Sequence, residues 1–166
     1  MTVRPIRLFG DPVLRTEADP VTAFDAELRA LVDDLEDTVR LPGRAGVAAP
    51  QIGVSLRVFS YNVAGQVGHL VNPVLSDFDG EQEDEEGCLS LPGLGYPTKR
   101  AMSVTARGFD RHGEPLVIHG TGFLARALQH ETDHLAGTLY IDTLTGEARR
   151  QALRELRRVS PSPQRR

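Results

Sequence analysis

Apolar residues recur at helical spacing early in the chain. Phe24, Leu28, Leu31, Leu35 and Val39 follow one another at intervals of three or four residues. Because a helix turns once in about 3.6 residues, this spacing places all of these side chains on one face. The pattern predicts an amphipathic helix of about five turns whose apolar face packs inward.

The middle of the chain favours strands. Four stretches rich in apolar residues, 57–62, 69–75, 102–109 and 116–119, are separated by Gly, Pro and Asp, as is typical of strands joined by turns. Thr121 and Gly122 can then open a second helix and Gly137 can close it. Within it, three leucines are spaced to bury one face: Leu124, Leu128 and Leu135.

The order of these elements indicates the fold class. A helix, then strands, then helices favours an α+β architecture, and 166 residues suit a single domain. We expect mainly antiparallel β-sheets surrounding the second helix, with one helix near the N-terminus and another near the C-terminus.

The second predicted helix carries a metal-ligand pattern. His130 and His134 are four residues apart, so they lie on one helical face with Cβ atoms about 5–6 Å apart. Glu131 follows the first histidine, where a carboxylate can carry protons. The pattern predicts metal-assisted hydrolysis, the alternative being two ordinary histidines of an amphipathic helix.

Cys88 is the candidate third ligand. No histidine follows His134, and Glu147 and Glu155 belong to an arginine-rich segment that resembles a separate, solvated terminal helix. As the only cysteine, Cys88 cannot form an internal disulfide, and a small buried apolar role is its usual one. With two histidines, however, a thiolate would leave one coordination position open for water, as a catalytic site requires.

Three motifs in order resemble the peptide deformylases. Gln129 to Gly137 match the family's Gln-His-Glu-x-Asp-His-Leu-x-Gly, and Glu86 to Pro92 match Glu-Gly-Cys-Leu-Ser-x-Pro. Gly46 to Gln51 match the end of Gly-x-Gly-Leu-Ala-Ala-x-Gln, with Val in place of Leu. At the position of the motif's first glycine, this chain has Arg44. The resemblance covers residues 4–145.

The resemblance implies hydrolytic removal of the N-formyl group from the initiator methionine of nascent polypeptides, giving formate and a methionyl peptide. Glu131 would be the general base. The Gln51 side-chain amide and the Leu89 backbone N–H would stabilise the oxyanion. Glu86 would pair with Arg100 and brace the cysteine loop.

The ligand residues and the family resemblance also indicate which metal and which substrate slot to expect. One divalent ion would be held by Cys88, His130 and His134. Affinity for nitrogen and sulfur ligands favours Zn2+, whereas the family implies Fe2+ as the native ion, with Zn2+ or another divalent ion as a substitute. The expected apolar slot for the methionine side chain consists of Gly46, Val47, Phe123 and Ala127. Arg126 is expected to point outward or to rim the groove.

Charge is distributed unevenly. Residues 77–86 contain seven acids and no base, which suggests a solvated loop. Residues 149–166 contain seven arginines and only one glutamate. We interpret this segment as a basic C-terminal helix and tail that extend the catalytic part, residues 1–148. This extension could contact ribosomal RNA, or it could be a solvated end.

Other features limit the function classes. The chain has no Trp and few aromatic residues, which argues against a base-stacking DNA binder. It shows no signal region and no membrane-length apolar stretch, so a cytoplasmic location is expected, and the family leads us to expect a monomer. The rival functions are a zinc endopeptidase or general amidase and a noncatalytic, metal-stabilised binding module.

Overall fold

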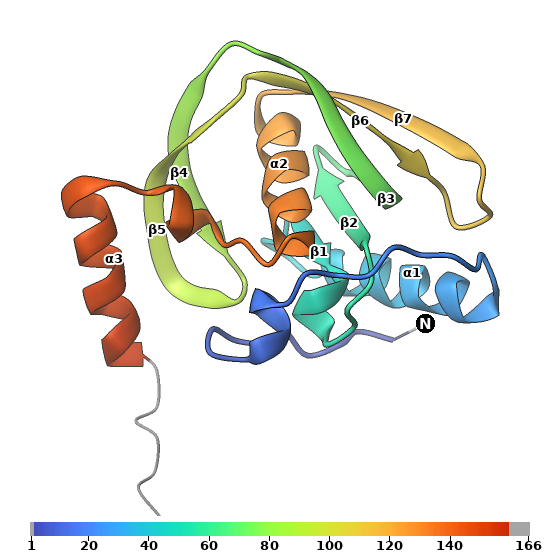
Figure 1. The fold of residues 1–166 in the computed structure, drawn as a ribbon, viewed down its shortest axis with the longest axis horizontal. Helices are drawn as coiled ribbons and strands as arrows, with labels where there is room; N and C mark the ends of the chain where they lie inside the picture. The colour runs from blue at the N-terminus through green and yellow to red at the C-terminus, as the bar shows by residue number, and fades with distance from the viewer. Residues whose placement is uncertain (1, 160–166) are drawn as a thin grey trace, which may run out of the picture.

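The computed structural model describes residues 2–159 (Figure 1). The three α-helices of this part are α1 (Ala26–Val39), α2 (Phe123–Leu135) and α3 (Gly146–Val159). Its strands are β1 (Gly46–Ala48), β2 (Val58–Val63), β3 (Gln66–Asp79), β4 (Gln82–Cys88), β5 (Leu91–Arg100), β6 (Ser103–Phe109) and β7 (Pro115–Thr121). Short 3-10 helices are η1 (Pro12–Arg15), η2 (Ala49–Ile52) and η3 (Tyr140–Thr143). None of the helices of residues 2–159 is long and apolar enough to span a membrane.

Two antiparallel sheets surround α2. The larger sheet has the strand order β1-β2-β3-β6-β7, and β4 pairs with β5 in a separate two-stranded sheet. Figure 1 shows α2 between them, with α1 beside β1 and β2 and α3 on the far side of β5. The expected α+β fold around a central ligand helix is confirmed.

The first helix forms as its apolar spacing predicts, but it is shorter. The Asp25 side chain accepts a hydrogen bond from the Leu28 backbone N–H at 3.0 Å and so caps α1. Phe24 therefore lies before the helix, where its ring packs edge-on against Phe109 with centroids 5.9 Å apart. The remaining apolar residues bury one face of α1 against β1 and β2.

The acidic stretch is the main local correction, because residues 77–86 are not a solvated loop. Asp77 to Asp79 end β3, and residues from 82 onward form β4, paired with β5 along its length. Glu83 and Glu85 are exposed, whereas Glu86 points inward and is 5% exposed. Pairing with β5 satisfies the hydrogen-bonding groups of the β4 backbone. The acidic composition of this stretch therefore did not predict its local structure.

A core cluster ties α3 to the rest of the domain. Ala152 and Leu156 on one face of α3 are buried against Leu91 and Tyr96 of β5 and against η3. The opposite face is solvated, as expected for the whole helix. The predicted boundary at 148/149 falls inside α3, and residues 160–166 of the predicted tail lie outside the described part.

Candidate metal centre and active site

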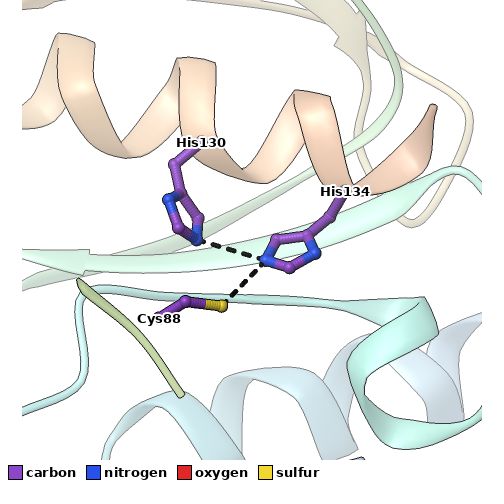
Figure 2. A group of neighbouring side chains, drawn as sticks. All are labelled: Cys88, His130 and His134. Atoms are coloured by element: carbon purple, nitrogen blue, oxygen red, sulfur yellow. Dashed lines mark hydrogen bonds between the residues drawn. The ribbon is translucent and has the colours of Figure 1, made fainter. Parts of the chain in front are cut away.

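Cys88 meets His130 and His134 at one point (Figure 2). Nε2 of His134 lies 3.1 Å from Nε2 of His130 and 3.3 Å from Sγ of Cys88. The histidines project from one face of α2, and a register irregularity between Glu86 and Cys88 at the end of β4 brings the thiol to them. Within residues 2–159, these are the residues grouped closely enough to hold a metal ion, their ligand atoms all lying within 4.8 Å of one another.

The donor set fits a divalent transition metal. One sulfur and two imidazole nitrogens converge, and at least one of the facing nitrogens must lack a proton for the histidines to approach so closely. Nδ1 of His134 is buried with no hydrogen-bond partner among the described residues. A thiolate with two neutral imidazoles matches the ligands of zinc and related ions and leaves a coordination position open.

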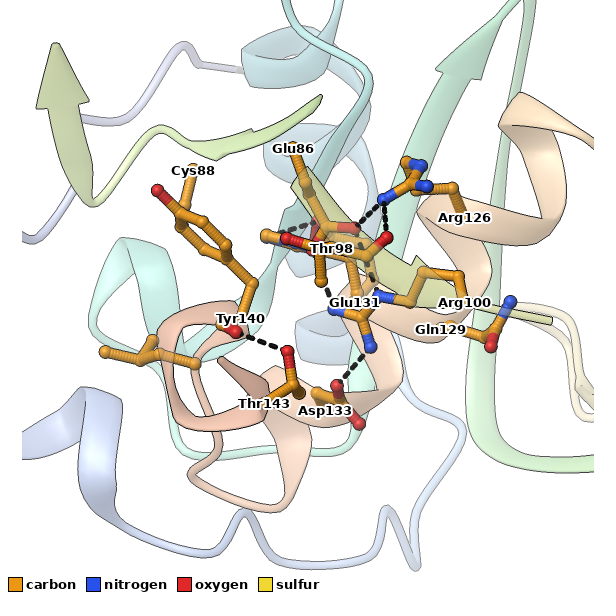
Figure 3. A network of polar contacts seen from close by, with 12 residues as sticks. Glu86, Cys88, Thr98, Arg100, Arg126, Gln129, Glu131, Asp133, Tyr140 and Thr143 are labelled. Carbon is orange, nitrogen blue, oxygen red and sulfur yellow. Dashed lines mark hydrogen bonds and ion pairs between the residues drawn. The ribbon is translucent and has the colours of Figure 1, made fainter. Parts of the chain in front are cut away.

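Glu86 holds His130 in place from the centre of a network that includes Arg100 and Arg126 (Figure 3). Oε2 of Glu86 lies 2.7 Å from Nδ1 of His130 and accepts from Nη2 of Arg100 at 2.7 Å, while Oε1 accepts from Nε of Arg100 at 3.0 Å. Burial opposes ionisation, but the bonds from His130 and Arg100 lower the Glu86 pKa to about 2. The ionised carboxylate keeps the His130 proton on Nδ1, so Nε2 faces the site as a lone-pair donor. The expected Glu86–Arg100 pair is confirmed.

The position of Arg126 differs from the one expected from the sequence. It was expected to point outward or to rim the groove. It is among the residues that line the cavity beside the ligands, but it is buried, with 3% exposure, and its Nη1 donates to Oε1 of Glu86 at 2.8 Å. The same nitrogen donates to the Thr98 carbonyl at 3.0 Å. A buried carboxylate needs this compensation, since Arg126 supplies a second positive charge beside Glu86. Its spacing of four residues from His130 was the available sequence signal, because that places both on one face of α2.

Asp133 also has a defined contact. Its Oδ2 accepts from Nη1 of Arg100 at 2.7 Å, so the arginine that grips Glu86 is itself held from α2. Figure 3 shows Asp133 joined to Arg100, and through it to the network around Glu86.

Glu131 lies beside the ligands and outside their group. Its side chain is buried, Oε1 is 3.8 Å from Nε2 of His130, and Oε2 has no partner among the described residues. Burial raises the Glu131 pKa to about 7. A Cβ at Gly46 would lie 2.7 Å from the Glu131 side chain, so the glycine leaves the room that this carboxylate occupies.

Gln51 presents its amide nitrogen to the site. Its Oε1 accepts from the Ala48 backbone N–H at 2.9 Å, which turns Nε2 toward Ser90 Oγ at 3.1 Å and Cys88 Sγ at 3.7 Å. The side chain, on η2, is 1% exposed. Ser90 was not singled out from the sequence, although it belongs to the cysteine motif.

A cavity of about 400 Å³ opens onto these groups. Gln51, Leu89 and Glu131 line it, together with three of the expected slot residues: Gly46, Phe123 and Ala127. Val47, the fourth, is fully buried in the core beside α1 and is not among the lining residues.

Arg44, which replaces the family glycine, turns away from the cavity. Its Nη1 donates to the Thr38 carbonyl at 3.1 Å, near the C-terminal end of α1. A cation is favourable at this end of a helix. Its neighbours Gly43 and Ala45 line the cavity, whereas Arg44 does not.

Comparison with known proteins decides the family. Residues 3–150 match the family model described as polypeptide deformylase. The chain belongs to this family. It is 60% identical over 157 residues to a peptide deformylase of Acidothermus cellulolyticus, covering 95% of this chain and 87% of that protein. It is 46% identical over 164 residues to peptide deformylase 2 of Streptomyces coelicolor, covering 95% and 92%.

Solved deformylase structures share the fold. The peptide deformylase of Thermus thermophilus is 40% identical with a TM-score of 0.88, covering 94% of both chains. That of Legionella pneumophila is 41% identical with a TM-score of 0.86, covering 96% of this chain and all of the other. The chain is therefore a hydrolase that removes the N-formyl group from nascent polypeptides. The predicted activity is confirmed, in preference to an endopeptidase or a noncatalytic module.

Proposed function

We propose that Glu131 is the general base and acid of the deformylation reaction. The observation that carries this proposal is its buried carboxylate, which has one unpartnered oxygen and lies 3.8 Å from a ligand nitrogen of His130. A pKa of about 7 suits Glu131 both to take a proton from the attacking water and to release it to the departing amine. The divalent metal, when bound, supplies a Lewis acid that polarises the formyl oxygen and acidifies water.

Gln51 and Leu89 are proposed to stabilise the oxyanion. The Ala48 N–H holds the Gln51 oxygen, so the amide N–H group remains directed toward the cavity. Leu89 follows Cys88 directly, which places its backbone N–H beside the thiolate at the cavity wall. Donors fixed before the reaction cost no reorganisation when charge develops on the formyl oxygen.

The methionine side chain is proposed to occupy the slot beside the ligands. Gly46, Phe123 and Ala127 would line it, and Val47 would support it from the core behind β1. Phe123 is 58% exposed and stands at the start of α2, where it suits the mouth of the slot.

The resident ion is proposed to be Fe2+, with Zn2+ or another divalent ion able to replace it. The sulfur and nitrogen donor set accommodates both ions. Metal analysis after strictly anaerobic purification from cells grown without added zinc tests this proposal. Stoichiometric zinc with negligible iron would contradict it.

Formate release from a formyl-Met dipeptide tests the assigned roles. The parent, Glu131→Gln and Cys88→Ala would be compared after anaerobic loading with ferrous iron. We expect Glu131→Gln to keep the metal and lose about 100-fold or more in turnover, and Cys88→Ala to lose the metal itself. Equal turnover in the parent and Glu131→Gln would overturn the role of Glu131. Cleavage of an unformylated internal peptide bond would indicate an additional endopeptidase activity.

The exposed face of α3 is proposed to contact ribosomal RNA, which would place a monomeric enzyme in the cytoplasm near new chains. Ala152 and Leu156 face the core, whereas the arginines of α3 are exposed: Arg149, Arg150, Arg154, Arg157 and Arg158. Glu147 pairs with Arg150 and Arg154, whereas Nη1 of Arg149 donates to the Asp142 carbonyl at 3.3 Å. Because a carbonyl does not neutralise a charge as a carboxylate does, Arg149, Arg157 and Arg158 are the most available for phosphate contacts.

Co-sedimentation with ribosomes at increasing salt tests this contact. The variant Arg149→Ala/Arg157→Ala/Arg158→Ala should bind more weakly and show a smaller dependence on salt. The matched control removes three exposed arginines elsewhere: Arg7, Arg40 and Arg107. Equal losses in both variants would indicate nonspecific attraction and contradict the proposal.

A further inference from the structure

Tyr140 carries a buried hydroxyl that the reaction as described does not use. The side chain is 1% exposed, and its oxygen has no hydrogen-bond partner among the described residues. A buried hydroxyl without a partner has lost its hydrogen bonds to water and gained none in return. Such a group calls for a partner that becomes a strong acceptor in the working protein.

The ring of Tyr140 lies against the metal ligands. It stacks on His130 with centroids 6.0 Å apart and planes 29° apart. Cys88 packs against the core cluster to which Tyr140 belongs. Figure 3 shows the phenol end of Tyr140 directed toward Cys88.

The two carboxylates whose charges act on Tyr140, those of Glu86 and Glu155, are already engaged. Each oxygen of Glu86 accepts two hydrogen bonds. Oε2 accepts from Arg100 and His130, and Oε1 accepts from Arg100 and Arg126. The two oxygens of Glu155 are taken by Tyr96 and by Gln151. A thiolate at Cys88 has lone pairs to spare even when it binds a metal.

The phenol can serve as the donor. A tyrosine hydroxyl keeps its proton near neutral pH, since its ordinary pKa is about 10.

We propose that the Tyr140 hydroxyl donates a hydrogen bond to the Cys88 thiolate in the metal-loaded protein and thereby tunes the ligand. A donor at sulfur stabilises its lone pairs and lowers the charge that sulfur gives to the metal. The ion remains more electron-poor, and a ferrous ion becomes harder to oxidise. Tyr140 is a positioning and tuning residue that acts through Cys88. The proposal rests on Cys88 as a ligand and not on the deformylation reaction.

The absorption spectrum of the cobalt(II)-loaded protein tests this. Charge transfer from sulfur to cobalt takes less energy when the sulfur loses a hydrogen bond, so the band of Tyr140→Phe should move to longer wavelength. Tyr96→Phe is the control, because it removes a neighbouring hydroxyl that donates its hydrogen bond to Glu155. The charge-transfer band of this variant should stay at the parental position. Superimposable bands in all three proteins would overturn the proposal, as would equal shifts in both variants.

Ferrous oxidation provides a second readout. In air, the iron of Tyr140→Phe should oxidise several-fold faster than that of the parent and of Tyr96→Phe. An unchanged rate together with an unchanged cobalt band would sink the idea whatever the deformylase activity of the variants.

The parent alone provides a test if Tyr140→Phe does not fold. In the zinc-loaded protein, nuclear magnetic resonance should show a slowly exchanging Tyr140 hydroxyl proton with a cross-relaxation contact to the Cys88 Hβ protons. A contact to the Tyr96 ring in its place would assign the hydroxyl to another acceptor and refute the proposal.

Discussion

Nδ1 of His130 lies 2.7 Å from Oε2 of Glu86, a contact that joins the ligand helix to the strand leading to Cys88. It connects two ligands that are 42 residues apart in the chain (130 − 88) through one ionised carboxylate. The same carboxylate anchors Arg100 and Arg126. Metal-site geometry is therefore set by a buried charge network as well as by the ligands themselves.

Removing the Glu86 charge should weaken metal binding. In Glu86→Gln, the amide cannot hold the His130 proton on Nδ1 as an ionised carboxylate does. We expect about 10–100-fold lower zinc affinity, measured by competition with a chromophoric chelator. Glu83→Gln, an exposed acid on the same strand, is the control. Matching affinities for parent and Glu86→Gln would show that the carboxylate is not needed to orient His130.

Truncating Arg126 should destabilise the fold. Arg126→Leu leaves the buried Glu86 with one compensating arginine, and breaking a buried pair costs about 3–5 kcal/mol. Urea unfolding of the metal-free protein measures the free energy of unfolding without the metal contribution. Arg107→Leu, which breaks an exposed pair with Asp77, should cost less than about 1 kcal/mol. The prediction fails if both variants lose the same stability.

A methyl group at Gly46 should displace Glu131. The Cβ of Gly46→Ala would lie 2.7 Å from the Glu131 side chain, which is buried and has little room to move. We expect kcat/KM to fall by about 10–100-fold, because a small misplacement of a catalytic group is costly, while metal content stays at the parental level. Loss of metal in parallel with activity would point to a different cause.

Glu36 should contribute stability that disappears in acid. Its Oε1 lies 2.8 Å from both His69 Nδ1 and Arg111 Nη2. The hydrogen bond from His69, opposed by burial and helped by the charge of Arg111, lowers the Glu36 pKa below its ordinary 4.5. Because the folded pKa is the lower one, this stability is present above about pH 4.5 and is lost as the pH falls through the folded pKa.

The difference in unfolding free energy between the parent and Glu36→Gln measures this effect. It should be about 1 kcal/mol at pH 7 and shrink toward zero in acid, in urea titrations of metal-free protein. Glu17→Gln, an exposed acid, should show no such trend. The prediction is contradicted if the difference in unfolding free energy between the parent and Glu36→Gln stays the same from pH 7 down to acid pH.

Local signals were enough for the helices and for the ligands. Spacing of apolar residues predicted α1, and the two histidines predicted the metal face of α2, because both patterns act within a few turns of one helix. Cys88 was reached through residue chemistry, since few side chains can complete a site with two histidines. The motifs then supplied Gln51 and Leu89, which no local pattern would have selected.

Long-range contacts account for what was missed. Arg126 meets Glu86 across 40 residues, so its burial depends on a strand that its own neighbourhood does not describe. The acids of β4 suggested a loop because their pairing partner, β5, follows later in the chain. The hydroxyl of Tyr140 has no local signature, since its surroundings combine η3, α2 and the end of β4.

The packing of α3 has a consequence for how the enzyme is made. Leu156 and Ala152 complete the cluster that supports Tyr140 and the β4–β5 hairpin, although all three metal ligands precede residue 135. A nascent chain with α2 already outside the ribosome and α3 still inside has every ligand but lacks this support. We therefore expect a chain truncated before α3 to carry all three ligands but to lack the packing that supports them, and so to take up metal less well than the chain that includes α3.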